Sequence, residues 1–203
     1  MIDHDREFIF VHLRRTAGNS IETALGGITL LDRNGNRTTN WDNSIHRGKT
    51  PYKIDNRGHY IHDTAQAIRR QFPEQFQAYK KFTIIRNPWD QLASLYCRLF
   101  PEDHEAAHFK RWIMARVRPE TGTLPFCSLY DTRGTLLVDV IGRYENLQSD
   151  FPNICKRCNI EQVALPVANT SSRPHYSEYY DRESREFVRR LCDPEIVEFG
   201  YQF

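Results

Sequence analysis

Two short apolar runs in this chain are each followed by arginine and small polar residues, a combination suited to binding an anion. The first run, FIFV at residues 8–11, leads into a loop, RRTAGNS, at residues 14–20. A helix-like pattern continues through Ile21 and Leu25. In a strand–loop–helix unit, the loop amides and the helix N-terminus point N–H groups at one place, where the helix dipole adds positive potential. The pattern therefore predicts a cradle for a phosphate-like group, with a turn bearing solvated arginines as the plainer alternative.

The loop departs from the phosphate loop of nucleoside triphosphate hydrolases, G-x-x-x-x-G-K-[ST]. Gly18 and Ser20 match that pattern, but Leu13 replaces its first glycine and Asn19 replaces its lysine. Without the lysine, the loop lacks the group that reaches the outer phosphates. The loop is thus predicted to bind an anion without hydrolysing a nucleoside triphosphate.

The second apolar run, at residues 82–85, ends at Arg86 and is followed by a helix start. The Asn-Pro pair at 87–88 suits an N-cap and a first helical position, and apolar residues then recur at a helical spacing. The end of a strand and the helix after it can face the same pocket, so Arg86 and Ser94 are predicted to contact one anion. The alternative is that Arg86 pairs locally with Asp90.

Four stretches resemble motifs of sulfotransferases that use 3′-phosphoadenosine 5′-phosphosulfate (PAPS). FIFVHLRRTAGNS resembles their 5′-phosphosulfate loop, H-I-P-K-T-A-G-T-S, and FTIIRNPWDQLASLY is similar to their 3′-phosphate motif, F-x-x-V-R-N-P-W-D-R-x-x-S-x-Y. IGRYENL at 141–147 resembles the family's G-R-Y-E-N-L strand. NTSSRPHY at 169–176 resembles its late N-x-S-x-R-x-x-Y loop, which precedes a C-terminal helix ending in F-G-Y. The branch that these motifs match best includes carbohydrate sulfotransferases and bacterial relatives.

The resemblance implies that the chain moves a sulfuryl group from PAPS to an acceptor hydroxyl, leaving 3′-phosphoadenosine 5′-phosphate, with no metal. It implies that the 5′-phosphosulfate lies in the first loop and the 3′-phosphate beside the second motif, with help from the late loop. The residues expected to bind PAPS are Arg14, Arg15, Thr16, Ala17, Gly18, Asn19, Ser20, Arg86, Ser94, Ser171, Ser172, Arg173 and Tyr176.

Sulfuryl transfer to a hydroxyl needs a base for the acceptor's proton, and a neutral imidazole suits that task near neutral pH. His62 stands before Thr-Ala, as a histidine near the sulfuryl group does in the family that the chain resembles, and His59 is the second choice. His12 is a third possibility that we expect to be structural. The polar segment 26–60 before these histidines is interpreted as facing the acceptor, with a surface excursion as the alternative.

Arg15 occupies the position of the lysine that is expected to assist the leaving group in the family. An arginine keeps the charge but is a poor proton donor, so the alternative is a PAPS- or nucleotide-binding protein with weak or no transferase activity. A phosphotransferase with an aberrant phosphate loop is a further rival. The missing lysine counts against that rival, as does Arg86 at a strand end where a Walker B aspartate would help to hold Mg²⁺.

The chain has 203 residues and a net charge of +2, which fits one globular domain over residues 1–203 and does not favour nucleic-acid binding. An odd number of cysteines, five, with no signal peptide, predicts reduced thiols, and we interpret Cys155-x-x-Cys158 as incidental. No apolar run is long enough to span a membrane, so we expect a cytoplasmic protein. The oligomeric state is left open.

Predicted strands at 8–11, 82–85 and 136–141 alternate with predicted helices, which indicates an α/β domain with a mostly parallel sheet flanked by helices. The resemblance implies more narrowly a P-loop-like sulfotransferase fold. It also leaves the acceptor open: a carbohydrate hydroxyl is our first choice, and a small alcohol, a phenol or a peptide tyrosine is the alternative. In an open parallel sheet, ligands bind beyond the carboxyl ends of the strands, which is where the predicted arginines fall.

Overall fold

The computed structural model describes residues 1–25, 64–117, 128–165 and 173–203. Its sheet has the strand order β1 (Ile2–Asp3), β2 (Phe8–Val11), β3 (Lys80–Ile85) and β4 (Val140–Arg143). β1 runs antiparallel to β2, whereas the β2–β3 and β3–β4 pairs are parallel. The predicted α/β class with a mostly parallel sheet is therefore confirmed.

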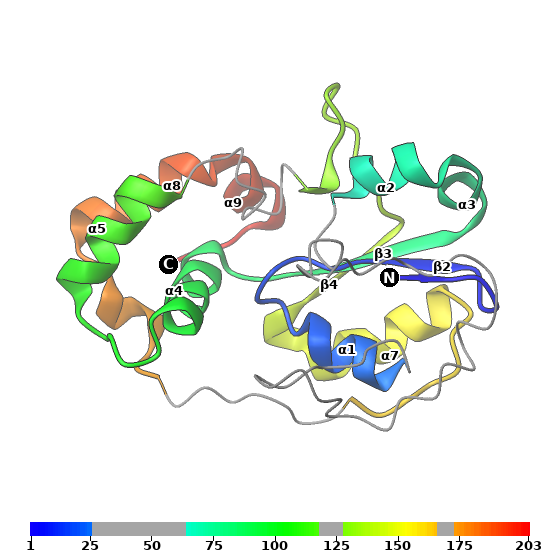
Figure 1. The fold of residues 1–203 in the computed structure, drawn as a ribbon, viewed down its shortest axis with the longest axis horizontal. Coiled ribbons are helices and arrows are strands. Elements are labelled where there is room, and N and C mark those ends of the chain that lie inside the picture. Colours follow the sequence, from blue (N-terminus) through cyan, green and yellow to red (C-terminus); the bar gives the residue numbers. More distant parts are fainter. Residues whose placement is uncertain (26–63, 118–127, 166–172) are drawn as a thin grey trace.

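Helices cover both faces of this sheet (Figure 1). α1 (Gly18–Ala24) and α7 (Leu147–Arg157) lie on one face, and α2 (Ala65–Gln71) and α3 (Pro73–Ala78) lie on the other. Burial on both faces explains why β2 is a continuous apolar run in which every residue is buried, rather than an alternating one.

Successive side chains of the central strands point into two separate cores. Phe8, Phe10 and Phe82 pack toward α1 and α7, with the Phe10 and Phe82 rings stacked at 4.8 Å. Ile9 and Val11 pack toward α2 and the segment around Leu129. Because side chains alternate between the two faces of a strand, the same strands contribute to both cores, and the sheet is packed between the two helical layers.

A helical layer stands at the carboxyl end of β3 and carries a third, aromatic core (Figure 1). It contains the helices α4 (Pro88–Leu99), α5 (Ala106–Arg116), α8 (Arg182–Leu191) and α9 (Asp193–Phe199), together with the short 3₁₀ helix η5 (Tyr176–Tyr179). Tyr96, Phe109 and Tyr179 lie at its centre. Since α4 follows β3 directly, this layer places the α4 side chains over the end of the sheet.

Side chains cap the first turns of α2 and α4, and the Asn87 cap is the one expected from the sequence. Thr64 accepts a hydrogen bond from the Ala67 amide, and the Asn87 side chain accepts from the Trp89 and Asp90 amides at the start of α4. No helix in the described ranges is long and apolar enough to cross a bilayer.

The strand predicted at 136–141 is wrong in its bounds, since β4 spans Val140–Arg143. Leu136 instead forms a bridge with Tyr130, and the Leu137 amide donates to the Leu129 carbonyl at 2.8 Å. The ladder with β3 begins only where the Asp139 amide reaches the Lys81 carbonyl. Leu137 and Val138 are buried in the core on the α2 side of the sheet although they lie outside the β-ladder, and Leu136 is exposed. Hydrophobicity alone therefore placed the strand too early.

Candidate anion-binding site

The loop after β2 turns sharply and lies against the start of α4. Arg15 and Ala17 both adopt left-handed backbone conformations, with φ of 66° and 63°. The Thr16 hydroxyl donates to the Leu13 carbonyl at 2.9 Å, and the side-chain Nε2 of Gln91 donates to the Arg14 carbonyl at 2.9 Å. The two bonds hold the loop from within and from α4.

Arg86, at the end of β3, is 6% exposed and has partners on several sides. Its Nε and Nη2 each lie 2.7 Å from Oδ2 of Asp90, and its Nη1 donates to the Arg15 carbonyl at 2.8 Å. The guanidinium also lies over the Tyr144 ring, 3.8 Å from the ring centroid. The local pair with Asp90 is thus formed, and the same guanidinium also binds the loop after β2.

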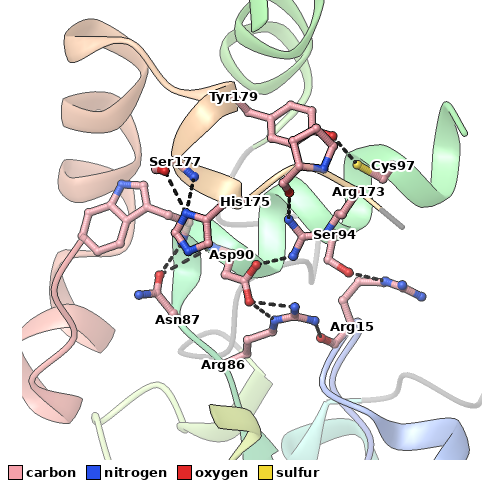
Figure 2. Close-up of polar contacts among 12 residues, drawn as sticks. Arg15, Arg86, Asn87, Asp90, Ser94, Cys97, Arg173, His175, Ser177 and Tyr179 are labelled. Carbon is pink, nitrogen blue, oxygen red and sulfur yellow. Dashed lines mark hydrogen bonds and ion pairs between the residues drawn. The ribbon is translucent and has the colours of Figure 1, made fainter. Parts of the chain in front are cut away.

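Arg173 completes the site from a part of the chain far along the sequence. Its Nη2 donates to Oδ1 of Asp90, so that carboxylate bridges Arg86 and Arg173. Arg15 donates through Nε to the Ser94 hydroxyl at 3.1 Å, one turn after Asp90 on α4. Figure 2 shows the Arg86 and Arg173 guanidinium groups meeting at Asp90, with the Arg15 side chain beside them on Ser94 of the same helix. We call Arg15, Arg86 and Arg173 the arginine cluster.

The arginine cluster carries more positive than negative charge. Among the described residues, Asp90 is the one carboxylate seen in an ion pair with its members, which leaves an excess of two positive charges. Burial lowers the pKa of Arg15, and the charges of Arg86, Arg98 and Arg173 lower it further. The positive potential of the arginine cluster, which further lowers the Arg15 pKa, also attracts anions. An anion with two negative charges would balance the excess of two positive charges.

The remaining predicted ligands lie around this cluster in different settings. Arg14 and Asn19 are on the exposed side of the loop, whereas Thr16, Gly18 and Ser20 are buried. Buried Thr16 has its hydroxyl on a carbonyl, so its side chain holds the loop itself. The sequence suggested a local pair between Asp90 and Arg86, but it did not suggest that Asp90 also binds Arg173.

Tyr176 lies half-buried in η5, edge-on to the Phe203 ring, and burial, followed by the charges of Asp90 and Glu145, raises its pKa. It therefore stays a neutral phenol beside the cluster. Ser171 and Ser172 lie outside the described residues, as do His59 and His62.

Two side chains outside the predicted set of ligands also support the site. Tyr144 supports the Arg86 guanidinium through its ring face, and Glu145 accepts a hydrogen bond from the Asn87 amide at 2.6 Å. Both belong to the GRYENL stretch at the end of β4, which is hydrogen-bonded to β3. The sequence could have indicated both residues, because β4 is a parallel neighbour of β3 and the residues after β4 must therefore lie beside Arg86.

The cysteines in the described ranges form no disulfide. Cys155 and Cys158 are thiols buried in the core under the sheet, whereas Cys97 is half-buried and Cys192 is buried in the aromatic core. Within the described ranges, no group of three or more His, Cys, Asp or Glu side chains is arranged to hold a metal ion. The Cys-x-x-Cys spacing therefore places two apolar-packed thiols at the end of α7, Cys155 in its last turn and Cys158 at its C-cap.

Comparison with models of known protein families, with curated proteins and with solved structures found no match to this chain.

Proposed function

We propose that this chain is a PAPS-dependent sulfotransferase with a P-loop-like sulfotransferase fold. The observation that carries the proposal is the convergence of Arg15, Arg86 and Arg173 with Ser94. Three separate motifs of the resemblance contribute these residues, and the arginines have an excess of two positive charges at the carboxyl end of a parallel strand. An ordinary surface turn does not require arginines from three distant segments to lie together.

The donor set suits a ligand with two phosphate-type groups. Arg86 and Ser94, with Arg173 from the late motif, would hold the 3′-phosphate, because guanidinium groups match phosphate oxygens in geometry as well as in charge. The amides of loop 14–20 would hold the 5′-phosphosulfate. The contacts of Arg15 with Ser94 and of Arg86 with the Arg15 carbonyl bring this loop and the start of α4 together, which supports the assignment.

PAPS supplies a sulfuryl group attached to a phosphate that can leave. In the proposed reaction, Arg15 offsets the negative charge that develops on the leaving phosphate oxygen. The acceptor hydroxyl forms the new oxygen–sulfur bond as the bond to the phosphate oxygen breaks. His62, with His59 as the second choice, takes the hydroxyl proton. The acceptor would be a carbohydrate or a small molecule that carries a hydroxyl group.

Calorimetric titration with 3′-phosphoadenosine 5′-phosphate and with adenosine 5′-phosphate tests the proposal. We expect the wild type to prefer the first nucleotide, and Arg86→Ala to weaken its binding by about 10–100-fold, the equivalent of one charge-assisted hydrogen bond. Ser94→Ala is a milder variant that keeps all charges. Arg133→Ala is the matched control, because it removes the same charge from an exposed turn.

Absence of binding by both nucleotides would refute the proposal at its foundation. Equal affinity for the two nucleotides would show that no 3′-phosphate site exists. Loss of binding in Arg133→Ala as large as in Arg86→Ala would show that bulk charge, rather than the site, attracts the ligand.

The alternative is a PAPS- or nucleotide-binding protein with weak or no transferase activity. It is favoured by one observation, that a guanidinium bonded to Ser94 stands where the family has a lysine. Transfer of labelled sulfate from PAPS to a panel of acceptors separates the two, with Arg15→Lys and His62→Ala beside the wild type. Turnover that Arg15→Lys raises and His62→Ala lowers supports the enzyme. Binding without turnover in wild type and Arg15→Lys supports the binding protein.

A further inference from the structure

His12 lies directly under the anion-binding loop as half of a buried hydrogen-bonded pair with Glu22. The side chains of His12 and Glu22 are 3% and 4% exposed, and His12 Nδ1 lies 3.0 Å from Glu22 Oε1. The imidazole stacks on Phe10, with ring centroids 5.5 Å apart and planes at 13°. The ring is thus held by β2 below it and by α1 beside it.

The same ring determines how closely the loop returns to the sheet. A Cβ atom at residue 18 would lie 1.8 Å from His12 Nε2 and 2.0 Å from His12 Cδ2. Because no side chain fits there, the Gly18 backbone rests on the face of the imidazole. Gly18 is needed for this close approach, and the position of the ring sets the position of the first turn of α1.

The turn that leads to Gly18 has a backbone that must be held in place. Arg15 and Ala17 have positive φ angles although neither is glycine, and such conformations persist where the surroundings determine them. On the α4 side, Arg86 and Gln91 hold the carbonyls of Arg15 and Arg14. On the sheet side, the His12 ring supports the turn through Gly18.

We propose that His12 and Glu22 are positioning residues for the anion-binding site. The buried pair holds Gly18 in place, and Gly18 in turn holds the strained Arg15–Ala17 turn. The turn directs the Arg15 side chain to Ser94, beside Arg86 and Arg173. Burial against Glu22 and Gly18 also separates His12 from the role of acceptor base. The identity of the ligand rests on the proposed function, whereas the support of the loop does not.

The test compares His12→Asn with Thr23→Ala, an exposed site on the same helix. His12→Asn keeps a side-chain N–H for Glu22 and removes the ring atoms Nε2 and Cε1 on which Gly18 rests. Two quantities are measured well below the melting temperature: the dissociation constant for 3′-phosphoadenosine 5′-phosphate, and deuterium uptake by peptides that cover residues 13–21. The melting temperature itself is recorded separately.

We expect His12→Asn to raise the dissociation constant by about tenfold or more and to speed exchange in loop 14–20, because a loosened loop loses the equivalent of at least one charge-assisted bond. Thr23→Ala should match the wild type in both. A lower melting temperature with unchanged affinity and unchanged loop exchange would overturn the proposal, because it is the result of a purely structural role.

Two further outcomes are also decisive. If His12→Asn does not fold, Glu22→Gln replaces it, since this change preserves shape and replaces the carboxylate that bonds His12 with an amide. Faster loop exchange then supports the proposal, and wild-type exchange refutes it. If the wild type does not bind the nucleotide, the proposed function fails. The exchange comparison alone then decides whether His12 and Glu22 hold the loop.

Discussion

Asp90→Asn is the change for which the structure predicts opposite effects on stability and on anion binding. The Asp90 carboxylate occupies donors of Arg86 and Arg173 with both of its oxygens. The asparagine side chain has nearly the same shape and keeps one oxygen acceptor, but it carries no charge. The substitution therefore leaves the arginine cluster without the carboxylate that balances part of its charge.

Folding stability should fall because like charges then remain close together. The side chains of Asp90, Arg86 and Arg173 are only 15%, 7% and 11% exposed, so solvent screens them incompletely. Removing one partner of a fully buried pair costs about 3–5 kcal/mol. Because this group is partly exposed and the amide still accepts a hydrogen bond, we expect a loss of about 2 kcal/mol.

Anion affinity should rise in the same variant. The Arg86 guanidinium keeps its Arg15 carbonyl partner at 2.8 Å and the Tyr144 ring at 3.8 Å, so its orientation does not depend on Asp90 alone. A negative charge about 6 Å from a bound anion opposes it by about 3 kcal/mol at an effective dielectric constant of about 20. Screening at this partly open site reduces that figure to about 1–2 kcal/mol, so affinity should rise by about 5–30-fold.

Calorimetric titration with inorganic sulfate and with 3′-phosphoadenosine 5′-phosphate, and urea unfolding of the same samples, measure the two effects. Asp139→Asn is the control, since it removes one charge from the ion pair with Lys81, whose nitrogen lies 3.0 Å away at the opposite end of β3. Weaker binding of both anions by Asp90→Asn would refute the reasoning, because it would mean that Asp90 orients the arginines for the ligand instead of competing with it.

Three other expectations concern stability and reactivity. Hydrogen bonds from Lys110 and then Ser184 lower the pKa of Asp181, so the stabilising effect of its carboxylate is present above roughly pH 4 and is lost as the pH falls. In urea unfolding, Asp181→Asn should lose less stability than the wild type as the pH falls, and an equal loss would contradict this. Burial raises the pKa of Cys158 to about 11, so iodoacetamide at mildly alkaline pH should modify half-buried Cys97 before Cys158 in peptide mass maps, and equal rates for these two would count against the packing. Phe82→Ala should cost about 3–5 kcal/mol of unfolding free energy, far more than Leu99→Ala at an exposed position.

Local patterns in the sequence were enough to predict the elements that carry the site. The apolar runs at 8–11 and 82–85 are strands because they are short, rich in aromatic and β-branched residues, and interrupted by turn or cap residues. Asn87 and Pro88 mark the start of α4, since capping depends on residues only a few positions apart. The convergence of Arg15 and Arg86 on one sheet edge also followed, because parallel strands align their carboxyl ends.

Only the tertiary structure showed how those groups share their partners. Asp90 bridges Arg86 to Arg173, which lies 83 positions further along the chain, and no local pattern specifies a contact over that separation. The His12 ring beneath Gly18 was equally invisible, because a lone histidine is compatible with many surroundings until packing chooses one. Periodicity and capping act between neighbours in the sequence and can be seen there. The charge balance of the site and the support of its loop arise from side chains that folding alone brings together.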